Sequence, residues 1–184
     1  MSELIETIED GVATLTMNRP EAMNALSGAI MGGLLDALPR LAADMRFIAR
    51  SARMTTAFAK VGFSGDFGSH YFLHKLVGTA KARELYFTAD IIDAEQAGAL
   101  GIVNRVVADD ELQAETTALA RRIADGPRIA LGYMKRNLLA AETEPFQTVL
   151  ELEAEHQARC AFTEDHKEAV AAFVEKRRPV FQGR

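Results

Sequence analysis

One acidic residue in a glycine-rich turn is the strongest candidate for chemistry in this chain. Asp66 lies among Gly62, Gly65 and Gly68, immediately before a helical pattern. A carboxylate that a rigid turn holds between packed elements can give or take a proton at a defined point of a substrate. An aspartate near a helix start can also act as a cap that accepts a free backbone N–H. The residues of this stretch alone leave both interpretations open.

Two histidines raise a second kind of chemistry. His70 and His74 are four residues apart in the predicted helix, a spacing that can bind a metal ion. No glutamate follows His70 as in the zinc-protease motif, and the sequence offers no evident third ligand. We therefore expect no metal site, and we interpret both histidines as surface or core-edge residues.

The patterns around this stretch predict the elements that position it. Residues 4–8 and 12–17 alternate apolar and polar side chains around a turn with Gly11, which predicts a β-hairpin. Ser27 is the predicted N-cap of a helix that ends near Leu41. Short strands are predicted at 45–49, 54–61 and 102–107, and helices at 66–76, 79–88 and 94–100.

The rest of the chain is almost entirely helical. Predicted helices cover residues 110–124, 127–141, 145–161 and 163–176. A chain that is strand-rich early and helical late predicts an α/β core at residues 1–108, followed by a helical region at residues 109–184.

Composition limits the class of protein. Of 184 residues, 48% are hydrophobic and 26% are charged, as in a globular domain with a real core. The net charge of −5 argues against nucleic acid as the main partner, because phosphate backbones require a basic surface. Cys160 is the single cysteine, and no signal peptide or membrane-length apolar stretch is evident. We therefore expect a cytoplasmic protein that does not bind a membrane.

Four segments in this order resemble the enoyl-CoA hydratase/isomerase (crotonase) family. They are residues 17–26 (MNRPEAMNAL), 43–49 (ADMRFIA), 57–107 and 172–184. The resemblance implies an α/β, crotonase-like (ClpP/crotonase) fold, with a ββα superhelix core and a C-terminal helical oligomerisation region. It also implies enoyl-CoA hydratase/isomerase activity on an acyl-CoA substrate, no cofactor, and a homotrimer or hexamer.

The same resemblance assigns roles to individual residues. Asp66 corresponds to the acid that moves a proton over the acyl group. Glu21 and Ala22 match a segment whose backbone lines the CoA entrance, although a plain turn explains them equally well. Phe173 matches a residue near the acyl chain and Lys176 one near a CoA phosphate, both reaching a neighbouring subunit. A core phenylalanine and a solvated lysine are the alternative interpretations.

The chain departs from the family between Ala42 and Ala43. By that comparison about 70 residues are absent there, and they include both backbone N–H groups of the family's oxyanion hole. Either the printed sequence omits these residues, or the chain carries a true internal deletion. We favour an omission, because deleting adjacent core strands would leave unpaired edges and exposed apolar faces.

Three functions follow from these observations. The first is an enzyme that stabilises a thioester enolate and uses Asp66 as acid and base. Hydratases of the family carry a glutamate where this chain has Phe58, which favours isomerisation over hydration. The second is a catalytically dead oligomeric scaffold that lacks the oxyanion hole. The third is an acyl-CoA hydrolase or dehalogenase that uses Asp66 as nucleophile.

Overall fold

The structure is a computed structural model that describes residues 2–22, 24, 27–37, 45–66 and 68–184. The predicted helix beyond residue 37 and the junction between Ala42 and Ala43 lie outside this part of the chain. Two compact units are present. The first contains Met1–Glu6 and Leu15–Ala118, and the second contains Thr7–Thr14 and Leu119–Arg184. The division at residues 108 and 109 follows secondary structure and stays a prediction.

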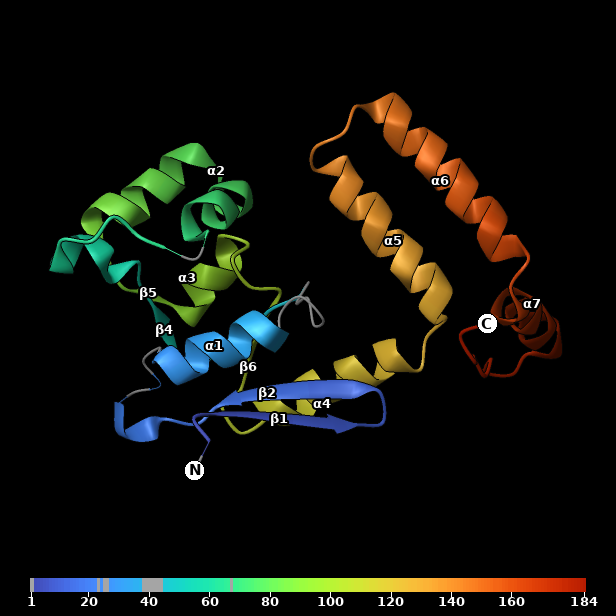
Figure 1. The fold of residues 1–184 in the computed structure, drawn as a ribbon, viewed down its shortest axis with the longest axis horizontal. Coiled ribbons are helices and arrows are strands. Elements are labelled where there is room, and N and C mark those ends of the chain that lie inside the picture. The colour runs from blue at the N-terminus through green and yellow to red at the C-terminus, as the bar shows by residue number, and fades with distance from the viewer. Residues whose placement is uncertain (1, 23, 25–26, 38–44, 67) are drawn as a thin grey trace. The chain divides into compact units, whose positions relative to one another are not determined.

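The predicted N-terminal hairpin is confirmed. Strands β1 (Leu4–Glu9) and β2 (Val12–Met17) form a two-stranded sheet (Figure 1). Asp10 and Gly11 both adopt positive φ, at 48° and 76°, as a tight two-residue hairpin turn requires. The Asp10 carboxylate accepts a hydrogen bond from Arg121 at 2.6 Å, which ties the turn to a helix of the second unit.

A short 3-10 helix and an α-helix follow the hairpin. They are η1 (Pro20–Ala22) and α1 (Gly28–Ala37). The predicted cap of α1 is confirmed, because the Ser27 hydroxyl accepts the Ile30 N–H at 3.2 Å and donates to the Glu3 carboxylate. Ile30 is fully buried.

Two short strand pairs frame the core of the first unit. Strand β3 (Phe47–Ala49) runs parallel to β6 (Arg105–Val107), and β4 (Arg53–Met54) runs antiparallel to β5 (Ile92–Asp93). The pairs pack around the buried side chains of Leu85, Ile92, Ala97, Ile102 and Val103.

The strand predicted at 54–61 is wrong beyond Met54. Ala57–Val61 forms a 3-10 helix, η2, which ends at Gly62 with φ of 72°. The cause lies in the two preceding hydroxyls. Thr55 donates to the Ala89 carbonyl at 3.1 Å and Thr56 donates to the Leu85 carbonyl at 2.7 Å. These bonds draw the chain towards a distant helix end and away from strand pairing.

The two helices predicted around Gly78 are halves of one kinked helix, α2 (Ser69–Thr88). Gly78 is non-helical, with φ of 75° and ψ of 167°. The helix begins at Ser69 rather than at Asp66. Helix α3 (Ala94–Ala99) follows, and Asp93 caps it as part of a capping box with Gln96.

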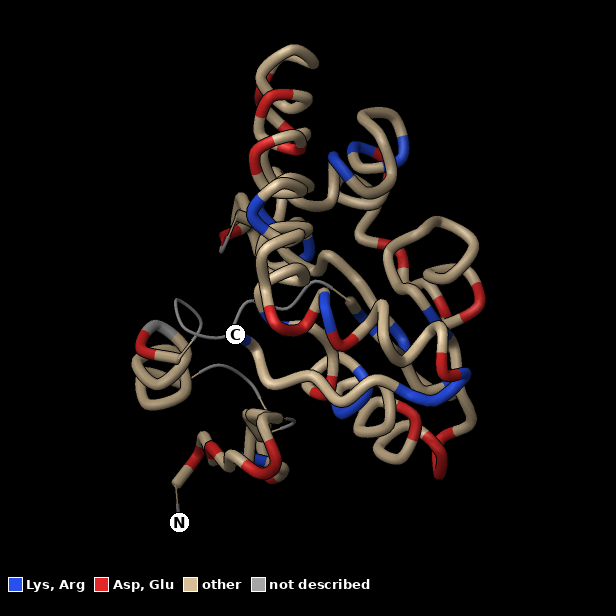
Figure 2. The backbone as a smooth tube through the Cα atoms, turned by 90° about the vertical axis from the view of Figure 1, so that its right-hand side faces the viewer, with Lys and Arg blue, Asp and Glu red and all other residues tan. Residues whose placement is uncertain are grey.

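The C-terminal half is helical, as predicted. Its elements are α4 (Leu112–Ala124), α5 (Arg128–Ala141), α6 (Phe146–Ala161) and α7 (Glu164–Glu175). Helices α5 and α6 form a hairpin (Figure 1) in which the rings of Tyr133 and His156 stack at 4.2 Å. Acidic residues follow one another along α6 (Figure 2). None of the helices in the described part of the chain is long and apolar enough to cross a membrane.

Candidate functional site

A cavity of about 710 Å³ lies in the first unit, between η2, the glycine-rich loop and both halves of α2. The residues that line it include the aromatic side chains of Phe58, Phe63, Tyr86 and Phe87. Phe67, a further aromatic residue next to Asp66 in the sequence, lies outside the described part of the chain.

Ring stacking fixes one wall of the cavity. The His70 ring stacks on Tyr86, with centroids 4.1 Å apart and planes 12° from parallel. The Phe58 ring lies 6.3 Å from Tyr86 and is also nearly parallel to it. Tyr86 is buried, so this wall presents flat, mainly apolar surface to the cavity.

A chain of hydrogen bonds holds the loop that carries Asp66. The Tyr86 hydroxyl donates to the Ser69 hydroxyl at 2.6 Å, and that hydroxyl donates to the Asp66 carbonyl at 2.6 Å. The Ser69 N–H donates to the same carbonyl at 3.0 Å. Gly65 has φ of 106°, and a Cβ there would overlap the His70 ring. Glycine at this position therefore allows the loop to pass close to α2.

The Asp66 side chain is exposed, and it does not itself line the cavity. Its neighbours in the loop do, because Ser64 precedes it and His70 follows it in the cavity wall. The capping interpretation is wrong for this side chain. Gly68 is the N-cap of α2, and no side-chain cap hydrogen bond is formed there. No hydrogen bond or ion pair joins the Asp66 carboxylate to another residue in the described part of the chain.

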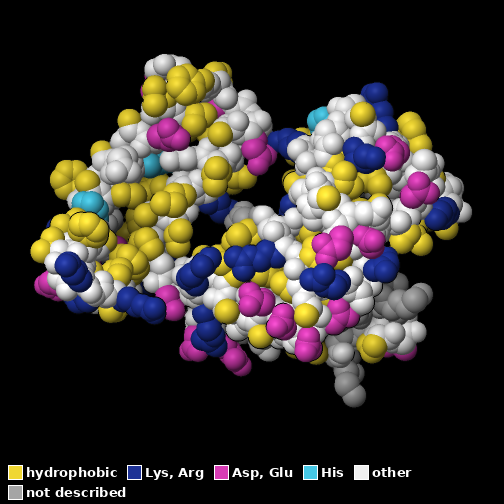
Figure 3. Space-filling model, turned by 180° about the vertical axis from the view of Figure 1, so that it is seen from behind, with side chains coloured by type: hydrophobic (Ala, Val, Ile, Leu, Met, Phe, Trp, Pro, Cys, Tyr) yellow, Lys and Arg dark blue, Asp and Glu magenta, His cyan; other side chains and the backbone are white. Residues whose placement is uncertain are grey.

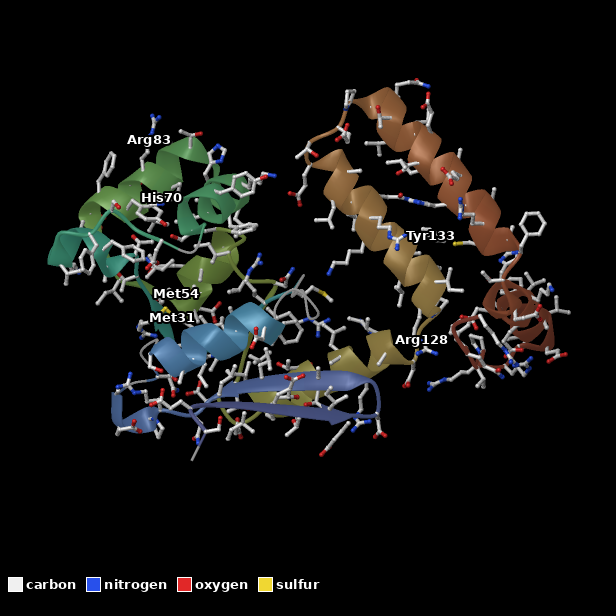
Figure 4. All side chains as sticks on the ribbon, in the orientation of Figure 1. Met31, Met54, His70, Arg83, Arg128 and Tyr133 are labelled. Atoms are coloured by element: carbon white, nitrogen blue, oxygen red, sulfur yellow. The ribbon has the colours of Figure 1, made fainter. Side chains whose placement is uncertain are left out.

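Polar side chains reach the cavity from both halves of α2. His70 comes from the first half and Arg83 from the second (Figure 4). His74 also comes from the first half. The described residues include no group of three or more histidine, cysteine, aspartate or glutamate side chains that could hold a metal ion. Both histidines are exposed, and His70 packs one face of its ring on Tyr86.

The predicted CoA-entrance residues lie in η1 of the first unit. Glu21 is exposed and its carboxylate lies 3.7 Å from the Arg19 guanidinium. The backbone N–H of Arg19 donates to the side-chain oxygen of Asn24 at 2.7 Å, and Asn24 has φ of 54°. Glu21 and Ala22 therefore lie in a tight turn that hydrogen bonds between its own residues hold together. Their role at a CoA entrance stays a prediction.

The other two predicted residues lie on α7 of the second unit. Phe173 is 85% exposed, so its interpretation as a core residue is wrong for the single chain. Lys176 ends the helix with φ of 55°, and its backbone N–H bonds to the Phe173 carbonyl. The structure does not place either residue relative to Asp66.

Sequence reasoning missed Tyr86 and Arg83. They lie three residues apart on the second half of α2, and both reach the cavity. The available signal was this i, i+3 spacing together with the nearby His70 and the break at Gly78. The pairing of Tyr86 with Ser69, 17 residues earlier, has no local signal.

The chain matches known proteins along most of its length. Residues 39–184 match the family model described as enoyl-CoA hydratase/isomerase. A 1,2-epoxyphenylacetyl-CoA isomerase of Escherichia coli is 36% identical over 78% of this chain and 55% of its own length. A short-chain-enoyl-CoA hydratase of Clostridioides difficile is 35% identical over 81% of this chain and 94% of its own length. The chain thus spans about half the length of the first of these relatives.

The fold has close counterparts among solved structures. The crystal structure of an enoyl-CoA hydratase from Mycobacterium tuberculosis aligns with a TM-score of 0.91 and covers 100% of both chains, at 22% identity. At this identity the match concerns the fold alone, and it confirms the predicted crotonase-like architecture.

Proposed function

Because the chain belongs to the enoyl-CoA hydratase/isomerase family, we propose that it acts on acyl-CoA thioesters and moves a proton with Asp66. The observation that carries the proposal is the position of the Asp66 loop. The loop contributes residues on both sides of Asp66 to the wall of the aromatic cavity. Its exposed carboxylate has no partner among the described residues, so it is free to contact a ligand that extends from the cavity past this loop.

The proposed reaction is a shift of the double bond. The Asp66 carboxylate takes a proton from a carbon of the acyl chain, and the electron pair of that C–H bond passes into a thioester enolate. The protonated acid then returns the proton to another carbon of the same conjugated system. The enolate oxygen needs main-chain N–H donors rather than a cofactor, and in this proposal they belong to the segment that is absent between Ala42 and Ala43. Phe58, at the place of a hydratase glutamate, lines the cavity, and this favours isomerisation over the activation of water.

The proposed assembly is a homotrimer or hexamer that the C-terminal helices form. Large apolar side chains of these helices are exposed in the single chain, and hydrophobic side chains gather along the α5–α6 hairpin (Figure 3). Leu138, Phe146 and Phe162 are each more than two thirds exposed. In the proposed assembly, Phe173 and Lys176 reach the acyl-CoA of a neighbouring subunit, and Glu21 and Ala22 line its entrance.

The test compares the parent protein with Asp66→Asn in two assays, 3-enoyl-CoA isomerisation and crotonyl-CoA hydration. Asp110→Asn is the matched control, because Asp110 is also an exposed aspartate of the first unit and does not line the cavity. We expect isomerisation to fall about 10²- to 10⁴-fold in the Asp66 variant, while butyryl-CoA still binds. Equal activity of the two variants would show that Asp66 is not the acid. A trapped acyl-aspartyl intermediate would instead support the hydrolase mechanism.

One observation favours a second candidate, the non-catalytic scaffold. The four glycines before Ala57 lie in the hairpin turn and in α1. None of them forms a glycine-rich turn between a strand and a helix in the described part of the chain, where two N–H groups could meet one oxygen. A polypeptide mass of 20.1 kDa together with assembly but no turnover in either assay would support the scaffold.

A further inference from the structure

One side chain of fixed charge lines the cavity in the described part of the chain. It is Arg83, and none of the described lining residues is acidic. Arg83 forms no ion pair with any residue in the described part of the chain, and it is exposed. Its neighbour Lys81 behaves differently, because its ammonium lies 2.7 Å from the Glu84 carboxylate. The second half of α2 therefore pairs one of its two cations with a carboxylate and leaves the other at the cavity.

The walls and the free cation suit a ligand with two different parts. Phe58, Phe63 and Phe87 offer apolar surface that a hydrocarbon chain would cover. Arg83 offers a planar fork of N–H donors, which matches a carboxylate or a phosphate in a bidentate arrangement. A purely apolar acyl group would remove water from this guanidinium without giving it a partner, which is unfavourable.

The position of the Asp66 loop decides which end of a CoA thioester enters. Ser64 and His70, on either side of Asp66, both line the cavity, so the reacting carbons lie at its mouth under the proposed function. The far end of the acyl chain then lies inside the cavity. The CoA phosphates lie on the opposite side of the thioester, outside the cavity.

We propose that the chain selects acyl groups that end in a carboxylate, and that Arg83 binds this carboxylate. The substrate class is the mono-CoA thioester of a short dicarboxylic acid. This inference rests on the proposed function, because it takes the cavity to be the acyl site. The aromatic walls hold the methylene groups, and the guanidinium supplies two N–H donors to the terminal carboxylate.

Binding of two unreactive ligands tests the inference. Glutaryl-CoA differs from butyryl-CoA by a carboxylate on the last carbon, so titration calorimetry with both ligands isolates that group. We expect the parent to bind glutaryl-CoA about 10- to 100-fold more tightly. Arg83→Gln should abolish this preference and Arg83→Lys should keep part of it. Lys81→Gln, which removes a charge from the same helix outside the cavity, should keep all of it.

Two outcomes would overturn the inference. One is a parent protein with no preference for glutaryl-CoA, or with no binding of either ligand. The other is an Arg83→Gln variant that loses affinity equally for glutaryl-CoA, butyryl-CoA and free CoA, because the anion bound by Arg83 would then be a CoA phosphate.

Turnover separates this inference from the proposed function. The 3-enoyl isomers of glutaconyl-CoA and crotonyl-CoA form the corresponding reactive pair, because the proposed isomerisation starts from a 3-enoyl thioester. Binding preference without turnover of either would contradict the proposed activity and leave the carboxylate site standing. Turnover of both at equal efficiency, unchanged in Arg83→Gln, would contradict only the carboxylate site.

Discussion

Replacing Asp165 by alanine should release the C-terminal segment from α7. Asp165 is 4% exposed, and its carboxylate accepts N–H groups from Gln182 at 2.7 Å and from Gly183 at 2.9 Å. Arg128 of α5 donates to the Gln182 carbonyl at 2.8 Å. The buried Asp165 carboxylate thus holds the Gln182–Gly183 backbone on α7, and the bond from Arg128 links the same backbone to α5.

The size of the effect follows from these bonds. A hydrogen bond to a charged group contributes about 1.5–3 kcal/mol, so two such bonds set an upper limit of about 3–6 kcal/mol. Gln182 is exposed, and its N–H regains water once the segment opens, which offsets part of the loss. We therefore expect the free energy of opening this segment to fall by about 2–3 kcal/mol. That difference corresponds to amide exchange about 30- to 150-fold faster at Gln182 and Gly183.

Amide hydrogen exchange at these two residues is the direct assay. Glu164→Ala is the matched control, because Glu164 is also an acid in the first turn of α7 but pairs with the exposed Lys167. Both substitutions remove the same favourable interaction with the helix N-terminus, so their difference isolates the two backbone bonds. Equal exchange in the two variants would refute the argument that Asp165 holds the segment.

Three further predictions concern a glycine, a helix cap and an ion pair. Gly65→Ala should lower the free energy of unfolding by about 1–3 kcal/mol in urea denaturation, because φ there is 106°; Gly132→Ala, in open helix surface, should instead raise it. Asp93→Ala should cost about 1 kcal/mol in the same assay, and Asp93→Asn should cost less. Arg177 lowers the pKa of Glu168 from 4.5 to about 2. The stabilisation from this pair is therefore complete above pH 4.5 and is lost as pH falls towards 2. Glu168→Gln should remove that pH dependence from amide exchange at Val180, and an unchanged profile would contradict it.

Local signals account for most of the correctly predicted elements. Asp10 and Gly11 specify a tight turn by their own backbone preferences, and Ser27, Asp93 and Thr163 each cap the helix that follows them. These interactions join residues within three positions of one another, so the sequence displays them directly. The strand predicted at 54–61 is wrong because Thr55 and Thr56 donate hydrogen bonds to a helix end about 30 residues later. No local sequence pattern indicates such distant bonds.

The candidate site divides in the same way. The glycine-rich loop around Asp66 was predictable, because three glycines mark it and a helical pattern follows. The cavity beside it was not, because its walls come from two segments that meet only after α2 bends. The i, i+3 spacing of Arg83 and Tyr86 was too weak a signal to single out Arg83, since an arginine on a helix is most often a solvated charge.

Gly78 connects these two observations. In a straight helix Tyr86 would lie about 25 Å along the axis from Ser69, at 1.5 Å for each of 17 residues. Their hydroxyls are instead 2.6 Å apart, because the chain reverses at Gly78. The φ of 75° there is strained for any residue with a Cβ. One glycine therefore brings the Tyr86 wall to the base of the Asp66 loop. The cavity is a consequence of this backbone reversal, and the residues that line it matter only because the reversal brings them together.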